Sequence, residues 1–169
     1  MNTDPAGVAN VHIHRYRARC SWQGSTGVGY EHYGRGHTVS APPAAGDLAL
    51  SSDPAFRGDP ARMNPEGLLV MAAASCQLLS FLAVAARARL DVVSYEDDAE
   101  AEMPEDDKPV RITSIRLRPR ITLRLGKADE ARVRQLVDLA HRECYIANSL
   151  RTEIVVEPTV VWLEAREQA

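Results

Sequence analysis

The three cysteines are the residues of this chain with the most reactive side chains. Cys76 lies within the most apolar stretch, residues 64–83, which reads NPEGLLVMAAASCQLLSFLA, whereas Cys144 lies in a second helical pattern and Cys20 near the N-terminus. A buried cysteine usually behaves as a small hydrophobic side chain. A cysteine that is held as a thiolate is a nucleophile. The pattern by itself leaves both interpretations of Cys76 and Cys144 open.

A nucleophilic Cys76 would need a positive charge beside it, because burial disfavours the thiolate. The expected helix begins near Pro65, so its N-terminal dipole lies about three turns, or ~16 Å, from Cys76 and cannot supply that charge. A cationic side chain must therefore come from elsewhere in the sequence. Cys20 lies in no comparable motif, and we interpret it as structural or incidental.

Composition predicts one globular domain over residues 1–169, with 45% hydrophobic and 25% charged residues. The net charge of −3 argues against nucleic-acid binding and against an anionic membrane surface. Residues 1–10 resemble a loose tail and not a secretory signal, which together with the odd cysteine count favours the cytoplasm. No Cys/His spacing matches a metal site, so we expect no metal. The apolar run at 68–86 is interrupted by polar residues, and we expect a core helix and no membrane span.

The elements that must position the cysteines alternate between strands and helices. Residues 10–42 have the character of strands, and residues 42–63 are rich in Pro, Gly, Ser and Asp, which predicts a long connecting loop. The first main helix is expected over about 64–89, with Asn64 as its N-cap and Pro65 at its first position.

Alternating charge predicts a hairpin between residues 91–103, which have an acidic face, and residues 111–125, which have an arginine face. A second main helix is expected over about 129–148, with Cys144 on its apolar stripe. The segment IVVEPTVVWL, residues 154–163, predicts a final strand. This order indicates an α+β or α/β sandwich and not a doubly wound fold, and of these we expect the α+β class, with antiparallel sheets and two main helices.

Several of these segments resemble the osmotically inducible protein C (OsmC) and organic hydroperoxide resistance (Ohr) family. NPEGLLVMAAASC is similar to the motif around that family's first cysteine, and ECYIANSL to the motif around its second. YEHYGRGHTVSA, SSDPAFRGDPARMNPE and YEDDAEAEM are similar to one branch of the family. The resemblance covers roughly residues 15–165, and it implies an OsmC-like fold in an intertwined homodimer whose two active sites lie at the subunit interface.

The resemblance also implies a role for four residues. Cys76 matches the peroxidatic cysteine and Cys144 the resolving one, while Arg35 matches the arginine beside the reactive thiolate and Glu66 the glutamate that holds this arginine. The implied activity is a thiol-dependent peroxidase that reduces organic or lipid hydroperoxides, forms a Cys76–Cys144 disulfide and protects against oxidative stress. A dithiol, such as a lipoyl protein, would reduce the enzyme, and no cofactor is expected.

Two further residues are candidates for the lining of the substrate pocket, His37 and Tyr145, although a lone histidine on a strand is more often a half-exposed residue of the sheet. Tyr145 stands where the family commonly has Pro, and Ala147 where it commonly has Ser, which bears on the substrate range. Two alternatives remain on the same fold: a non-catalytic dimeric stress or ligand-binding protein, and a thiol redox sensor whose disulfide does not cycle.

The spacing of Glu66 and Cys76 imposes a geometric condition. Ten residues of straight helix rise ~15 Å, so the two side chains could share one site only if the segment between them is interrupted. We predict an interruption between residues 66 and 74, with Gly67 as its natural position. An unbroken helix across residues 65–88 would exclude Glu66 as a direct partner of the site.

Overall fold

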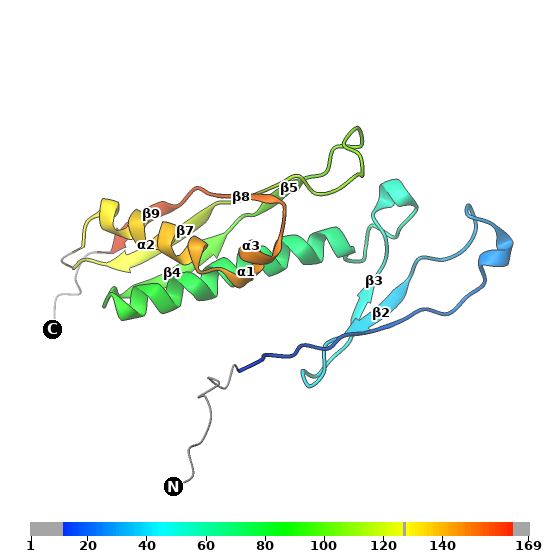
Figure 1. The fold of residues 1–169 in the computed structure, drawn as a ribbon, viewed down its shortest axis with the longest axis horizontal. Helices are drawn as coiled ribbons and strands as arrows, with labels where there is room; N and C mark the ends of the chain where they lie inside the picture. The colour runs from blue at the N-terminus through cyan, green and yellow to red at the C-terminus, as the bar shows by residue number, and fades with distance from the viewer. Residues whose placement is uncertain (1–11, 127, 164–169) are drawn as a thin grey trace, which may run out of the picture. The chain divides into compact units, whose positions relative to one another are not determined.

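The computed structural model describes residues 12–126 and 128–163, and the chain divides into two units at the bond between Asn64 and Pro65 (Figure 1). The expected tail at residues 1–10 lies outside the described residues.

The first unit contains a small antiparallel sheet in the order β1-β2-β3. Its elements are β1 (Arg19–Ser21), the 3₁₀ helix η1 (Thr26–Val28), β2 (His37–Ser40), β3 (Leu48–Leu50) and the 3₁₀ helix η2 (Pro54–Phe56). The expectation of a loop throughout residues 42–63 is therefore wrong. Leu48 and Leu50 pair with Val39 and His37, which turns part of this segment into the third strand.

The second unit combines three helices with two sheets, as the expected α+β class requires. Its helices are α1 (Pro65–Arg87), α2 (Glu130–Arg142) and α3 (Tyr145–Ser149). Its strands are β4 (Val92–Asp97), β5 (Glu100–Glu102), β6 (Ser114–Leu117), β7 (Pro119–Arg124), β8 (Glu153–Val156) and β9 (Thr159–Leu163). The sheet orders are β4-β7-β9 and β5-β6-β8.

The expected charged hairpin is present. β4 pairs with β7 and β5 with β6, both antiparallel, and Glu100 lies opposite Arg116. On the solvent face, Glu100 forms ion pairs with Arg116 and Arg118. The apolar residues that alternate with these charges are buried: Ile115, Leu117, Ile121 and Leu123. The alternation in the sequence therefore correctly predicted the buried and the exposed face of this hairpin.

The C-terminal segment differs from the single strand that we expected. It forms two strands, β8 and β9, which pair in parallel with β6 and β7 and so belong to different sheets. Pro158 lies between them and has no N–H to continue a ladder, which fits the break at this point. The sheets are thus mixed and not purely antiparallel.

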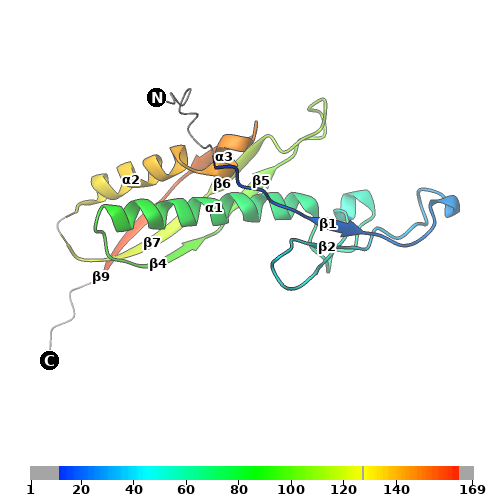
Figure 2. The ribbon, with the colours of Figure 1, turned by 60° about the horizontal axis from the view of Figure 1, so that its bottom comes forward.

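The core of the second unit lies between the two long helices and the sheet β4-β7-β9. Figure 2 shows α1 and α2 side by side over these strands. On α1, the buried residues recur at helical spacing along one stripe, and they are Ala73, Gln77, Phe81, Val84 and Ala85. Phe81 packs in one cluster with Ile121 of β7 and Leu136 of α2. This packing fixes the rotation of α1 and therefore the direction in which Cys76 points.

Several large apolar side chains of α1 are uncovered in the single chain. Met71, Leu79 and Leu82 are exposed, Leu79 to 63%. Among the described residues α1 is the one helix with the length and composition to cross a membrane, and 28% of its most apolar window is buried within the chain. Core helices of soluble proteins meet the same criterion, so this finding by itself assigns no membrane.

Candidate active site

Cys76 and Cys144 come together although they are distant in the sequence. Cys76 lies in the middle of α1 and is partly buried, whereas Cys144 is 1% exposed, and both thiols are free. The backbone N–H of Ile146, two residues after Cys144, contacts the Cys76 sulfur, and the side chain of Cys76 raises the pKa of the Cys144 thiol, so the two thiols are neighbours. The structure therefore places the two expected site cysteines close enough to share one reaction.

A break in the second helix creates this proximity. The helix that we expected over residues 129–148 ends at Arg142, and Cys144 adopts extended backbone angles (φ −70°, ψ 113°) before α3 begins at Tyr145. No Gly or Pro marks this break in the sequence ECYIANSL, so residue patterns alone extended the helix through it. The break makes Cys144 the residue that caps α3.

The first turn of α3 directs backbone N–H groups at both sulfur atoms. The N–H of Ile146 donates a hydrogen bond of 3.5 Å to the Sγ of Cys76. Burial raises the pKa of the Cys144 thiol, and the neighbouring Cys76 raises it further, while the N–H groups of Ala147 and Ile146 oppose this shift. Hydrogen bonds from N–H groups favour the thiolate form of sulfur. Sequence reasoning missed this donor because it belongs to the backbone.

An open pocket of about 490 Å³ leads to Cys76. It is lined by Cys76, Leu79, Ser80, Ala83, Glu143, Tyr145 and Asn148. Tyr145, which we expected at a substrate pocket, lies on its wall with 81% of its surface exposed. Glu143 forms an ion pair of 2.9 Å with Arg87, which joins α1 to the end of α2. The pocket thus offers a largely apolar approach to the more accessible of the two site thiols.

Glu66 does not lie beside Cys76 of the same chain. α1 is one continuous helix over Pro65–Arg87, so the predicted interruption between residues 66 and 74 is wrong. A straight helix separates the two residues by ~15 Å along its axis. By the condition stated above, Glu66 is not a direct partner of Cys76 in this chain.

Glu66 lines a separate hollow of about 380 Å³ at the N-terminal end of α1. Arg111 and Arg151 lie in the same lining, together with Leu69 and Ile112. The Oε2 atom of Glu66 is buried and accepts no hydrogen bond among the described residues. This carboxylate oxygen can therefore still accept a hydrogen bond from a further donor.

Arg35 and His37 belong to the first unit. The guanidinium of Arg35 lies 3.8 Å from the ring centre of Tyr33 and 4.8 Å from that of Tyr30, and it donates to the carbonyl oxygens of both tyrosines. The Nδ1 atom of His37 lies 2.9 Å from the carbonyl oxygen of Arg35. These contacts hold Arg35 in a preformed orientation on its loop. Its role at the Cys76 thiolate, and that of His37 at the substrate, stay predictions.

Sequence reasoning missed two residues of β4 with buried polar atoms, Tyr95 and Asp97, of which Tyr95 lies near enough to Cys144 to feel its charge. The hydroxyl of Tyr95 and the Oδ2 atom of Asp97 are buried, and neither has a hydrogen-bond partner among the described residues. Burial raises the pKa of Tyr95, and the charges of Asp97 and Cys144 add to the shift. Burial also raises the pKa of Asp97, although its Oδ1 accepts a 2.7 Å hydrogen bond from the N–H of Arg118. Within the described ranges, no cluster of three His, Cys, Asp or Glu residues is arranged to hold a metal ion.

Comparison with known proteins gives matches to one family. A family model described as OsmC-like protein matches residues 58–159. No curated protein matches the chain. An OsmC-like protein of unknown function from Vibrio cholerae is similar in structure, with 28% identity and a TM-score of 0.79 over 87% of this chain and 100% of the other.

Two further solved structures resemble the chain at lower identity. An organic hydroperoxide resistance protein from Elizabethkingia anophelis has 16% identity and a TM-score of 0.67, over 90% of this chain and 99% of the other. An organic hydroperoxide resistance protein from Legionella pneumophila has 18% identity and a TM-score of 0.61, over 89% and 99%. Likenesses at this identity establish the fold alone.

Proposed function

Because the chain belongs to the OsmC-like protein family, we propose that it is a thiol-dependent peroxidase that reduces organic hydroperoxides. The observation that carries the proposal is that the Cys144 thiol neighbours Cys76, which lines an open pocket. The names of the Elizabethkingia and Legionella proteins point to the same substrate class. An accessible thiol beside a buried one suits a reaction in which the first is oxidised and the second resolves it.

The proposed reaction has three balanced steps. The Cys76 thiolate attacks the distal oxygen of ROOH, the O–O bond breaks, and the departing alkoxide takes up a proton to leave as ROH, while Cys76 becomes a sulfenic acid. The Cys144 thiol then attacks this sulfur, the S–S bond forms, and the hydroxyl leaves with the thiol proton as water. A dithiol reduces the disulfide by exchange and is itself oxidised to a disulfide. We propose the cytoplasm, a reducing compartment, as the place where such a dithiol is supplied.

Each contact of the site has a place in this scheme. The Ile146 N–H stabilises negative charge on Cys76 before the attack. Leu79 and Ala83 provide apolar surface for the alkyl group of the hydroperoxide, which favours organic over hydrogen peroxide. Tyr145 forms the exposed wall over which the substrate enters.

We further propose that a homodimer completes the site. The uncovered apolar face of α1, with Met71, Leu79 and Leu82, is a suitable surface for a second copy of the chain. The continuous α1 leaves Glu66 too far from Cys76 of its own chain, so Glu66 would serve the site of the other subunit. Arg35 would supply the positive charge at the thiolate, and the unpartnered Oε2 of Glu66 would accept from its guanidinium.

The test is steady-state reduction of cumene hydroperoxide and of hydrogen peroxide with dihydrolipoamide as the reductant. We expect fast turnover with a preference for cumene hydroperoxide, and complete loss of turnover in Cys76→Ser. Cys20→Ser, which changes an exposed cysteine outside the pocket, is the matched control and should retain activity.

Two other results would replace the proposal. A stoichiometric Cys76–Cys144 disulfide that dihydrolipoamide does not reduce would identify a redox sensor. Absence of turnover together with slow alkylation of Cys76 at neutral pH would identify a non-catalytic binding protein.

A further inference from the structure

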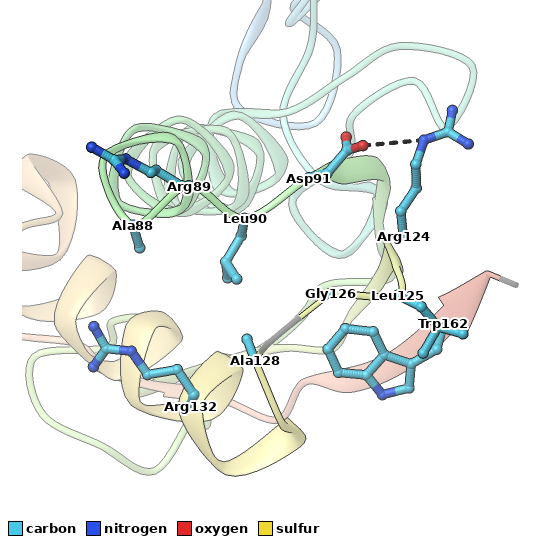
Figure 3. Close-up of a pocket in the computed structure, with 10 residues that line it drawn as sticks. All are labelled: Ala88, Arg89, Leu90, Asp91, Arg124, Leu125, Gly126, Ala128, Arg132 and Trp162. Carbon is cyan, nitrogen blue, oxygen red and sulfur yellow. Dashed lines mark ion pairs between the residues drawn. The ribbon is translucent and has the colours of Figure 1, made fainter. Parts of the chain in front are cut away.

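A second hollow, at the C-terminal end of α1, is separate from the cysteine pocket. Its volume is about 520 Å³, and it lies wholly within the second unit between the ends of α1, β7 and β9 and the start of α2 (Figure 3). None of its lining residues lines the pocket at Cys76. The proposed peroxidase chemistry does not use it.

Two exposed arginines at this hollow have no counter-ion within the part of the chain that the structure describes. Arg89 and Arg132 form no ion pair among the described residues, and Arg132 makes only a long contact of 3.4 Å with the side-chain oxygen of Gln135. A third arginine, Arg124, is engaged by Asp91 at 3.1 Å, and its guanidinium is turned away from Leu90 and Ala128 (Figure 3). Both arginines are thus unpaired within residues 12–126 and 128–163, in a chain whose net charge is −3.

The backbone at Arg89 is unusual for its residue type. The N–H of Leu90 bonds to the carbonyl of Ala85 and that of Arg89 to the carbonyl of Ala86, which is the Schellman arrangement that ends a helix. Arg89 holds the left-handed position of this motif with φ 59°, a conformation that glycine adopts most readily. A side chain that is retained at such a position is a reason to look for a function in it.

The rest of the lining is mainly apolar. Leu90 and Ala128 face each other across the middle of the hollow, with the indole of Trp162 on one side and the guanidinium groups of Arg89 and Arg132 on the other (Figure 3). The hollow therefore has an aromatic surface at one end and two cations at the other. This arrangement matches a ligand that has an apolar body and a negatively charged end.

We propose that this hollow binds a small organic carboxylate with an aromatic or similarly flat apolar body. The carboxylate accepts charge-assisted hydrogen bonds from Arg89 and Arg132, and the body lies over Leu90 and Ala128 towards Trp162. The proposal does not rest on the peroxidase function, because it uses neither cysteine of the site and no substrate of that reaction.

Isothermal titration of the full chain with 2-naphthoate tests this proposal. The uncharged 2-naphthylmethanol has the same ring system without the carboxylate, and inorganic phosphate supplies an anion without an apolar body. We expect 2-naphthoate to bind with one site per chain and at least tenfold more tightly than either comparison compound.

Arg89→Gly is the most informative variant, because glycine suits the left-handed backbone and the helix end should keep its structure. We expect it to weaken 2-naphthoate binding at least tenfold, and Arg132→Gln to do the same. Arg134→Gln is the matched control: Arg134 lies on the same helix, is exposed, pairs with Glu130 and lines no part of the hollow. Its affinity for 2-naphthoate should equal that of the wild type.

Several results would overturn the proposal. They are the absence of binding at millimolar 2-naphthoate, unchanged affinity in Arg89→Gly, and equal affinity for 2-naphthylmethanol. Equally tight binding of phosphate would also overturn it, since the apolar body would then contribute nothing.

Discussion

The backbone N–H of Ile146 donates a 3.5 Å hydrogen bond to the sulfur of Cys76, and Ile146 follows Cys144 by two residues. One short helix, α3, thus contacts the accessible thiol through its backbone and carries the buried thiol at its cap. The position of Cys144 relative to Cys76 and the polarity around Cys76 are therefore set by the same structural element. Disturbing the first turn of α3 should affect both thiols.

Replacing Ile146 by proline removes this N–H while leaving a residue type that the first turn of a helix tolerates. We expect iodoacetamide to alkylate Cys76 about five- to tenfold more slowly at pH 7, because one hydrogen bond to the thiolate is lost. The rate is measured by mass spectrometry of the Cys76 peptide in a Cys20→Ser background. Ile146→Ala is the control, since it loses the packing of the side chain against the Ala73 cluster but keeps the N–H. Equal rates in both variants would show that packing, and not the N–H, governs reactivity.

The resolving step should accelerate with pH. Burial raises the pKa of Cys144, so its thiol stays protonated at neutral pH and the nucleophilic thiolate is a minor species. We expect the rate of disulfide formation after one equivalent of cumene hydroperoxide to rise about tenfold per pH unit from pH 6 to 8. Acid quenching followed by maleimide labelling measures this rate. A plateau below pH 8 would contradict the raised pKa, and Cys144→Ser should form no intrachain disulfide at any pH.

Tyr145→Ala should change the substrate preference. Tyr145 forms an exposed wall of the pocket, so its removal takes apolar contact from a bulky substrate and little from a small one. We expect KM for cumene hydroperoxide to rise several-fold while kcat/KM for hydrogen peroxide stays within about twofold of the wild type. Tyr145→Phe, which keeps the ring, should resemble the wild type. A lower KM for cumene hydroperoxide in Tyr145→Ala would instead show that the ring obstructs entry.

Asp97→Asn should stabilise the second unit near neutral pH. Burial raises the pKa of Asp97, so the folded protein favours the neutral acid and the ionised form lowers stability above the folded-state pKa. Asparagine is uncharged and its oxygen can still accept from the N–H of Arg118. We therefore expect a higher Tm at pH 7.

The pH dependence of this effect has a definite sign. Wild-type stability attributable to Asp97 is present below the usual carboxyl pKa of 3.8 and is lost as pH rises through the raised folded-state pKa. The advantage of Asp97→Asn should therefore vanish near pH 3. Glu96→Gln, an exposed neighbour on β4, is the control and should leave Tm unchanged. An Asp97→Asn variant that is less stable than the wild type at pH 7 would show that the ionised carboxylate is favoured in the folded state.

Local residue patterns were sufficient to predict much of the second unit. The alternation of charge along 91–103 and 111–125 predicted the β4–β7 and β5–β6 pairings, because side chains of a strand alternate between its two faces. The apolar run before and after Cys76 predicted α1 almost to its ends. The same patterns failed at Cys144, where α2 ends without Gly or Pro, and at Pro158, where one expected strand divides between two sheets.

The sequence by itself determined which residues are suited to redox chemistry, the two long helices and the α+β class, since these follow from residue type and from periodicity along the chain. Only the tertiary structure decided that Cys144 approaches Cys76, that Ile146 supplies an N–H to the sulfur, and that Glu66 lies far from Cys76 of its own chain. The hydrogen bond from the Ile146 N–H to the Cys76 sulfur joins residues 70 positions apart. This contact depends on how α1 and α3 pack together. A stripe of apolar residues along a helix predicts which face is buried, but it does not predict which other helix or strand packs against that face.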